Sequence, residues 1–472
     1  MMNIHKSTFA LFFGNRGFFP ASLIAQARKD LPRLLKSWGH EVIMLDESAT
    51  RYGAVETREE GERYANFLRA HQGKFDGVIL SLPNFGDEFG AVTALKEAGV
   101  PILIQAYPDE LDKMGPALRR DSFCGKLSIM DVFQQFGVKF TNLKPHVVDP
   151  HSPKFEENVD YFDRVCRVVK HLQGMTIGAI GARTTPFKTV RIDEVTLQRH
   201  GITVETLDLA EVIARVKALP ADSDAYRAKA NFFKEYVLWD GVPAHAFDHL
   251  IKLGVVLDEI IQSYQMDAIA IRCWIELQQQ LGISPCVLLG ALNNNMLPAA
   301  CEVDLGSAIS MYLLSLASGE PPVCLDWNNN YDGQEDKCIL FHCGPAPKAM
   351  MQEGGRVTDH AILETSLGKG CSYGPHVGRL APMDFTFANL LTQEGAVNVY
   401  LGQGRFTEDP IPADFFGVAG VAEVNHLEDV LLYLGRKGHR HHVNLTRGHF
   451  QAPLQEALAY YLGYQVALPQ GD

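Results

Sequence analysis

The feature that most constrains this chain is a regular alternation, over its first two thirds, of short apolar segments with longer amphipathic ones. The apolar segments have the length of β-strands, and the segments between them have helical spacing. Apolar strands joined by helices are typical of parallel sheets that carry helices on both faces. The apolar segments lie at 8–13, 41–46, 75–83, 101–108, 175–182, 202–208 and 267–272.

The pattern predicts three domains. A polar stretch at 144–158 interrupts the alternation of strand-like and helix-like segments, which then restarts. We therefore expect two successive Rossmann-like domains. After Asp326 the segments become shorter, alternating and bounded by turns, which indicates an antiparallel sheet or barrel. The expected fold class is therefore α/β, with two Rossmann-like parallel-sheet domains followed by a β-rich C-terminal domain. We place the domains at 1–158, 159–322 and 323–472.

Composition excludes several classes of partner. A formal net charge of −13 and a pI of about 5.7 argue against nucleic acid or an anionic membrane as the main partner. No apolar run reaches the roughly 20 residues that span a bilayer. The nine cysteines form no CxxC pair and most lie in apolar contexts, which is typical of reduced core residues. With no signal peptide at the N-terminus, we expect a cytoplasmic protein.

Two carboxylates lie in unusually apolar surroundings. Glu302 follows Ala-Ala-Cys, and Asp326 ends the strand-like Pro-Val-Cys-Leu. Burying a carboxylate is costly unless it is hydrogen-bonded, paired or bound to a metal. Alternatively, Glu302 could cap a helix and Asp326 a turn. From these two residues alone, a capping role and a shared functional role have equal weight. His342 and His449 each end a strand-like segment, where histidines are more often structural than ligating.

The combination of these four residues is more informative than any one of them. Two carboxylates with one or two imidazoles suit Mn²⁺, Co²⁺ or Mg²⁺ better than structural zinc. A site with so few protein ligands leaves room for two adjacent substrate oxygens. The basic tract 436–442 reads as mostly solvated, with His442 as the member that can point inward.

Several motifs, taken in order, resemble the L-fucose isomerase family and, more distantly, the L-arabinose isomerases. They are RTTPFKTVRIDE (183–194), CEVDLGSAIS (301–310), LDWNNN (325–330), FHCG (341–344) and HHVNLTRGHF (441–450). This resemblance implies a metal-dependent aldose–ketose isomerase with two Rossmann-like domains and a β-rich third. It further implies that Glu302, Asp326 and His449 bind Mn²⁺, and that His342 matches an additional ligand of the arabinose branch. It also implies a homo-oligomer, from dimer to hexamer, with the active site near a subunit interface that Arg16 reaches.

The resemblance also implies a mechanism. Glu302 removes the proton from C2 of the open-chain aldose, a cis-enediol forms, and Asp326 shuttles the hydroxyl proton. The expected substrate is a free sugar of the fucose or arabinose type. Candidate substrate-binding residues are Arg16, Asn84, Lys188, Arg191, Trp327 and Asn328.

Two alternatives stay open at this point. One is an isomerase of an anionic hexose such as sulfoquinovose, which it would convert to sulfofructose. Its anion partners would come from Arg16, Arg183, Lys188, Arg191 and Arg379. The other is a non-catalytic sugar-binding protein built on the two α/β domains; such a protein would carry no stoichiometric Mn²⁺.

Overall fold

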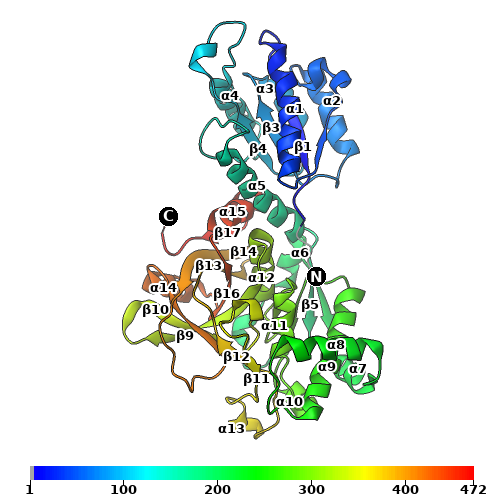
Figure 1. Ribbon diagram of the computed structural model, residues 1–472, viewed down its shortest axis with the longest axis vertical. Coiled ribbons are helices and arrows are strands. Elements are labelled where there is room, and N and C mark those ends of the chain that lie inside the picture. Colours follow the sequence, from blue (N-terminus) through cyan, green and yellow to red (C-terminus); the bar gives the residue numbers. More distant parts are fainter. Residues whose placement is uncertain (1–4, 472) are drawn as a thin grey trace. The chain divides into compact units, whose positions relative to one another are not determined.

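A computed structural model describes residues 5–471 of the chain. The chain divides into two compact units (Figure 1). The N-terminal unit extends to Lys170 and includes Glu456–Leu462, and the C-terminal unit comprises His171–Gln455 and the end of the chain from Gly463. Among the described residues, no helix is both long and apolar enough to cross a membrane.

The N-terminal unit is built on a four-stranded parallel sheet in the order β2-β1-β3-β4. Alternate side chains of β1 enter two separate cores, with Phe12 in one and Phe13 in the other, because helices cover both faces. The strands are β1 (Phe9–Phe13), β2 (Val42–Met44), β3 (Gly77–Leu82) and β4 (Ile102–Ala106). The helices are α1 (Ala21–Ser37), α2 (Arg58–Ala70), α3 (Glu88–Leu95), α4 (Ser122–Gln135) and α5 (Pro153–Leu172).

The end of the chain contributes a π-helical turn, Glu456–Tyr461, to this unit. The Glu456 carboxylate accepts hydrogen bonds from the hydroxyls of Thr141 (2.6 Å) and Tyr161 (2.7 Å). The sequence analysis placed these residues in the C-terminal domain, and it placed the first boundary at 158, inside α5. The compact N-terminal unit extends to Lys170, near the end of α5.

The C-terminal unit begins with a second parallel sheet, in the order β6-β5-β7-β8. Its strands are β5 (Thr176–Ile180), β6 (Thr203–Leu207), β7 (Ala268–Ile271) and the two-residue β8 (Ala299–Ala300). Its helices are α6 (Glu194–Arg199), α7 (Leu209–Ala218), α8 (Asp224–Tyr236), α9 (Ala244–Ser263), α10 (Glu276–Leu281), α11 (Cys286–Asn294) and α12 (Leu305–Ser318).

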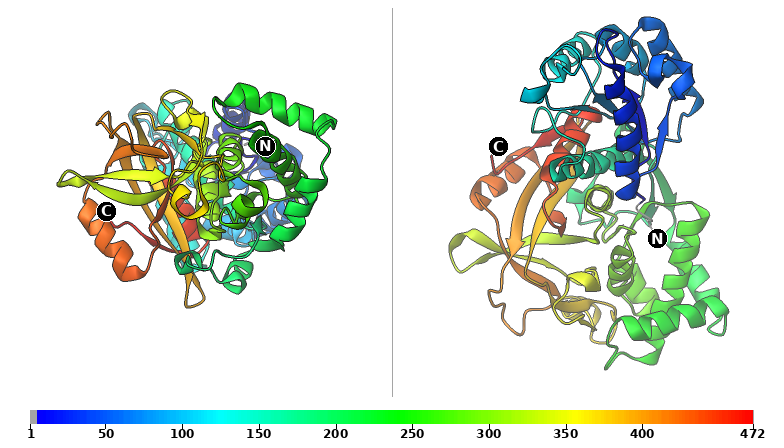
Figure 2. Two further views of the ribbon diagram at one scale, coloured as in Figure 1. Left: turned by 90° about the horizontal axis from the view of Figure 1, so that it is seen from below. Right: turned by 45° about the horizontal axis from the view of Figure 1, so that its top comes forward.

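The rest of this unit is a nine-stranded mixed sheet, shown from two further directions in Figure 2. A short pairing of β14 with β15 closes six of its strands into a barrel, in the order β15-β10-β9-β16-β13-β14. The strands are β9 (Pro322–Tyr331), β10 (Gln334–His342), β11 (Arg356–Val357), β12 (His376–Arg379), β13 (Met383–Gln393), β14 (Ala396–Phe406), β15 (Val418–Glu423), β16 (His442–Arg447) and β17 (Gln465–Ala467). Helices α13 (Glu364–Leu367), α14 (Leu427–Lys437) and α15 (Gln451–Gln455) complete it. Two Rossmann-like sheets and a β-rich C-terminal part are thus confirmed.

Helix α12 joins the parallel sheet to the barrel. Every residue from Leu305 to Ala317 is buried, as expected of a helix that is apolar on all sides. It contacts β7 and β8 of the parallel sheet and β9, β13 and β16 of the barrel. The start of α12 is therefore fixed between two layers, and the candidate site lies there.

Candidate active site

The loop between β8 and α12 aims a carboxylate out of the end of the parallel sheet. Glu302 and Val303 have φ angles of 64° and 57°, in the left-handed region. This conformation costs roughly 1–3 kcal/mol per non-glycine residue, so it persists only where the surroundings enforce it. Asp304 then caps α12, accepting hydrogen bonds from the backbone N–H (3.1 Å) and hydroxyl (2.7 Å) of Ser307. The carboxyl end of a parallel strand is where α/β folds bind ligands.

Asp304 orients an imidazole from the barrel. The carboxylate is fully buried, pairs with Arg440, and lies 2.7 Å from Nδ1 of His442 on β16. Burial raises the pKa of Asp304, but the Arg440 guanidinium and the His442 imidazole lower it to well below its usual range. An ionised Asp304 accepts the Nδ1 proton of His442, which leaves Nε2 to face the other carboxylates.

Those carboxylates belong to Glu302 and Asp326. His442 Nε2 lies 3.0 Å from Glu302 Oε2 and 3.5 Å from Asp326 Oδ1. One ligand atom each of Glu302, His342 and His442 lies within 4.8 Å of the others. Glu302, Asp326, His342 and His442 are called the acid–histidine cluster below. It joins the end of the parallel sheet to three barrel strands, β9, β10 and β16.

The cluster fits a divalent cation. Glu302 Oε2 and Asp326 Oδ1 are shielded from solvent, and neither has a hydrogen-bond partner of good geometry among the described residues, although His442 Nε2 lies close to both. An unpartnered buried oxygen of this kind costs about 1–3 kcal/mol or more, so it calls for a ligand. Two carboxylate oxygens and two imidazole nitrogens form a donor set that suits Mn²⁺ or Co²⁺.

In the absence of a cation, protons stabilise the cluster. Burial raises the pKa of Asp326, although His342, His442 and His441 oppose the shift. Burial lowers the pKa of His342, but Cys343, Asp326 and Glu302 raise it to about 9. Despite burial, Cys324, Asp304 and Glu302 raise the pKa of His442 well above its ordinary value. A cation and these protons therefore compete for the same atoms.

The structure corrects one predicted ligand. His449 lies outside the cluster, with a 55% exposed side chain and its Nε2 3.4 Å from Asp384 Oδ2. The reason is its position after the end of β16, in the turn before α15. His442 instead lies inside, because it starts β16 and shares a face with the buried Asn444, opposite Val443. The alternation of HVNLTR is the sequence signal that could have found it.

Aromatic side chains surround the cluster. The Trp274 indole N–H donates to Glu302 Oε1 at 3.3 Å, and Phe187 packs edge-on against Trp274 with ring centroids 5.4 Å apart. Phe187 also contacts His441 and His442, at 5.7 and 6.3 Å between centroids. The sequence analysis assigned no site role to Trp274, Phe187 or His441, since each reads as ordinary core or surface.

Phe187 belongs to the basic loop after β5. The Arg183 guanidinium donates to the backbone carbonyls of Thr184, Thr185 and Phe187, so it holds the loop together. Lys188 and Arg191 are exposed, and Arg191 Nε donates to the Lys188 carbonyl at 3.0 Å. The structure thus places Lys188 next to an aromatic side chain that contacts the cluster.

Trp327 and Asn328 lie elsewhere than expected for substrate-binding residues. Trp327 points to the opposite face of β9 from Asp326, where it packs edge-on against Phe387 in the barrel core. Asn328 is exposed at an irregularity in the pairing of β9 with β10, and donates to Asn329. Trp327 therefore supports the barrel.

Arg16 and Asn84 meet in the N-terminal unit, at the carboxyl ends of β1 and β3. Asn84 Oδ1 accepts from the Arg16 backbone N–H at 3.2 Å. The Arg16 guanidinium donates to the Gly86 carbonyl at 2.8 Å, pairs with Glu88 and lies 4.3 Å over the Phe85 ring. The two residues thus meet beyond the ends of two adjacent parallel strands.

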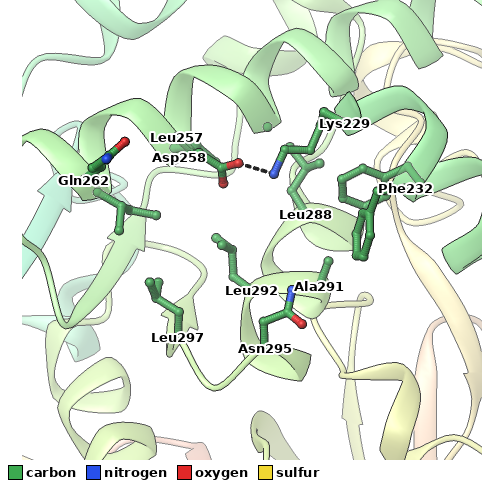
Figure 3. A pocket seen from close by; sticks show the side chains of 13 residues that line it. Lys229, Phe232, Leu257, Asp258, Gln262, Leu288, Ala291, Leu292, Asn295 and Leu297 are labelled. Atoms are coloured by element: carbon green, nitrogen blue, oxygen red, sulfur yellow. Dashed lines mark ion pairs between the residues drawn. The ribbon is translucent and has the colours of Figure 1, made fainter. Parts of the chain in front are cut away.

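Two cavities of the described residues lack this chemistry. A cavity of about 520 Å³ between α8, α9 and α11 is lined mainly by apolar side chains, with a Lys229–Asp258 ion pair at its side (Figure 3). A second cavity, of about 730 Å³, includes Arg379, whose guanidinium donates to the carbonyls of Gly378, Pro412 and Phe415. Neither includes a member of the acid–histidine cluster among its lining residues.

A Rossmann-like sheet, a closed barrel and an acid–histidine cluster where they meet form the arrangement expected of an aldose–ketose isomerase. Residues 10–173 match the family described as fucose/sulfoquinovose isomerase, N-terminal domain, and residues 340–468 match L-fucose isomerase, C-terminal domain. The chain belongs to the L-fucose isomerase-like family.

Curated relatives agree with this assignment. A sulfoquinovose isomerase of Priestia megaterium is 24% identical over 396 residues, covering 82% of this chain and 84% of the relative. A sulfoquinovose isomerase of Alkalicoccus urumqiensis is 22% identical, covering 66% and 70%. A solved solute-binding protein of Burkholderia multivorans is 11% identical and covers 67% of this chain and 95% of its own, but with a TM-score of 0.18 it carries no argument.

Proposed function

We propose that this protein is a Mn²⁺-dependent isomerase of a C6-sulfonated hexose, interconverting sulfoquinovose and its ketose, sulfofructose. The observation that carries the proposal is the pair of unpartnered buried oxygens, Glu302 Oε2 and Asp326 Oδ1, facing His442 Nε2. The substrate follows from the relatives, which bear the name sulfoquinovose isomerase. We further propose a cytoplasmic homo-oligomer in which Arg16 serves a neighbouring subunit.

The four residues of the cluster share the cation, and its two carboxylates also move protons. Glu302, Asp326, His342 and His442 would hold the cation, which when bound would polarise the C1 and C2 oxygens of the open-chain sugar. Glu302 removes the proton from C2 and returns it to C1. The Trp274 N–H keeps the Glu302 carboxylate in place through Oε1, so that the other oxygen is available. Asp326 moves the proton between the two hydroxyl oxygens, and its raised pKa suits that exchange.

Lys188 is the proposed partner of the sulfonate. It follows Phe187, which packs on the rings of His441 and His442, and its side chain is exposed. An ammonium that reaches the far end of the bound sugar would select an anionic substrate. The Phe187 ring would meanwhile shield the reacting carbons from water.

A panel of sugars tests the proposal. Purified protein with added Mn²⁺ is assayed for ketose formation from sulfoquinovose, glucose, L-fucose and D-arabinose. Glucose differs from sulfoquinovose only in its C6 hydroxyl, so we expect kcat/KM for glucose to be lower by at least about a hundredfold. Lys188→Ala should lower kcat/KM for sulfoquinovose by roughly ten- to a hundredfold, the worth of a charged hydrogen bond. Lys217→Ala, at an exposed lysine of α7, is the matched control.

Glu302→Gln tests the chemistry independently of the substrate. The amide keeps the shape of the side chain but cannot accept the C2 proton, so we expect kcat to fall by about 10²–10⁴-fold with little change in thermal stability. Full activity in this variant would refute the proposed mechanism. Failure of wild-type protein to convert any of the sugars would refute the proposed function.

A neutral sugar is the second candidate, because the C-terminal match is to L-fucose isomerase. Turnover of L-fucose or D-arabinose that exceeds that of sulfoquinovose, and that is unaffected by Lys188→Ala, would establish it.

A further inference from the structure

A cluster of thiols lies directly behind the acid–histidine cluster. The sulfurs of Cys286, Cys301 and Cys343 all lie within 4.8 Å of one another, and Cys286 Sγ is 3.5 Å from Cys343 Sγ. The Cys301 thiol also contacts that of Cys273. These four residues are called the sulfur cluster below. It contains four of the nine cysteines of the chain.

Four separate segments bring these sulfurs together. Cys273 follows β7, Cys286 starts α11, Cys301 follows β8, and Cys343 follows β10. Cys273, Cys286 and Cys301 are at most 5% exposed. A buried cysteine usually serves as a small apolar side chain, and Cys166, Cys324 and Cys338 are accounted for in that way. Apolar packing alone does not explain why four thiols converge here. An imidazole nitrogen also lies close to them, with His342 Nδ1 3.2 Å from Cys343 Sγ.

We propose that Cys286, Cys301 and Cys343 bind a soft d¹⁰ cation of the Zn²⁺ class as thiolates, with Cys273 as a fourth sulfur. A Zn–S bond of about 2.3 Å places tetrahedral sulfurs about 3.8 Å apart. The Cys286–Cys343 separation of 3.5 Å and the 4.8 Å limit on the other pairs of Cys286, Cys301 and Cys343 lie on either side of that value, so these three side chains need only small rotations. Cys273 lies outside this group of mutually close sulfurs and has farther to move. Binding releases the thiol protons to solvent and changes no oxidation state. Thiolates select such a cation over Mn²⁺ or Mg²⁺, whereas the acid–histidine cluster has no sulfur ligand.

The position of the sulfur cluster gives this cation a structural consequence. Cys301 immediately precedes Glu302, Cys343 immediately follows His342, and Cys273 precedes Trp274. A cation held by these sulfurs ties the ends of β7 and β8 to the end of β10. It would therefore fix the backbone behind three side chains of the active site. The inference rests on the thiols alone and does not depend on the proposed function.

Cadmium is the probe for this site, because its bonds to thiolates give an ultraviolet charge-transfer band that oxygen and nitrogen ligands do not give. Full-length protein is stripped of metal, reduced with a phosphine under argon, supplied with Mn²⁺ and titrated with Cd²⁺. We expect one equivalent to bind with the thiolate band, and the band to be lost in Cys286→Ser and in Cys343→Ser. Cys338→Ser, at a buried cysteine of β10, is the matched control and should retain it.

A second measurement needs no variant. Relative to the metal-free protein, Zn²⁺ should slow alkylation of the half-buried Cys343 of the wild-type protein, as counted by mass spectrometry of peptides, and should leave the exposed Cys124 equally reactive. Absence of the band together with unprotected thiols would overturn the proposal. So would a Cys286–Cys343 disulfide that forms in air in a protein whose reduced form binds no Cd²⁺, since the pair would then be redox-active instead.

Discussion

His442 is the residue on which the geometry of the active site depends most. Its Nδ1 is held by Asp304, and its Nε2 faces both Glu302 and Asp326. His442→Gln removes a ligand from the centre of the site, so we expect Mn²⁺ affinity to fall by more than about tenfold, with loss of isomerase activity. Isothermal titration with Mn²⁺ measures the first effect, and ketose formation measures the second.

His449→Gln is the control for this variant. The residue lies in the same sequence motif, seven positions later, but its imidazole is exposed beside Asp384. We expect Mn²⁺ affinity and activity to stay within about twofold of wild type, as surface substitutions usually do. The opposite result, with metal lost from His449→Gln and kept by His442→Gln, would restore the assignment made from the sequence.

Protonation of the cluster predicts how metal binding responds to pH. The pKa of His342 is raised to about 9 and that of His442 is raised well above its ordinary value, so near neutral pH both imidazoles are in the cationic form in the metal-free protein. Mn²⁺ must displace these protons, so its affinity rises with pH up to about 9, by about tenfold per pH unit for each proton released.

Titrations of Mn²⁺ in buffers with different heats of ionisation count the protons released. We expect at least one at about pH 7, and fewer in His442→Gln. An affinity that does not change between mildly acidic and mildly alkaline buffer would contradict the protonation state described here.

The sequence predicted the charged members of the site better than the histidines. Glu302 and Asp326 stand out because a carboxylate beside apolar residues is costly, and that cost is visible in composition. The choice between His442 and His449 depends on which residue starts the strand and which follows it. Strand boundaries are the least certain part of any sequence pattern, so the histidine ligand was placed at His449, after the strand, and not at His442, which starts it.

At the scale of elements, the start of α12 determines how the barrel and the parallel sheet meet. Asp304 caps this helix and pairs with Arg440 and His442 in a fully buried position. Asp304→Asn leaves the Arg440 charge buried without its partner, which costs about 3–5 kcal/mol of unfolding free energy. It also frees His442, so Mn²⁺ affinity should fall by about 10–100-fold. Denaturant unfolding and metal titration measure the two effects.

Acid sensitivity gives a second readout of the same variant. The folded pKa of Asp304 is lower than its unfolded value of about 3.8, so its contribution to stability is present above that pH and is lost as the pH falls below it. Asp304→Asn should therefore unfold with a weaker dependence on acid than wild type. Asp208→Asn, at the exposed cap of α7, should cost well under about 1 kcal/mol because asparagine caps a helix about as well as aspartate, and a comparable cost in both variants would contradict the role given to Asp304.

Elements differed in how readily the sequence revealed them. The apolar strands β1, β3, β4, β5 and β7 follow the expected segments closely, because buried parallel strands have few polar interruptions. Strand β8, with two residues, is too short to leave a periodic signal, although it carries Glu302 at its end. The closure of the barrel by β14 and β15 depends on a pairing between distant segments, which local patterns do not encode.

At the scale of the whole molecule, the sequence predicted three domains where the structure has two compact units. The sequence analysis assigned the parallel sheet of 171–322 and the barrel to different domains because their hydrophobic patterns differ. In the structure α12 is buried between them, and they form one unit. The return of Glu456–Leu462 to the N-terminal unit was also missed, since its apolar residues suit either core. Periodicity identifies which face of an element is buried but does not identify its partner.

This division predicts where metal binding stabilises the molecule. All four residues of the acid–histidine cluster belong to the C-terminal unit, on the β8–α12 loop and on β9, β10 and β16. Mn²⁺ at a hundredfold excess over its Kd stabilises the state that binds it by about 2.7 kcal/mol. Amide hydrogen exchange in α12, β9 and β16 should therefore slow by up to about a hundredfold where exchange requires opening of this unit.

The N-terminal unit serves as an internal reference, because β1 and β3 contain no member of the cluster and their exchange should stay unchanged. His442→Gln should abolish the protection by Mn²⁺ in the C-terminal unit, whereas His449→Gln should retain it. Equal protection of both units would mean that metal binding acts on the whole chain, and protection confined to the N-terminal unit would place the metal elsewhere. Protection of α12, β9 and β16 that depends on His442 would tie the cation to the atoms that the structure leaves unpartnered.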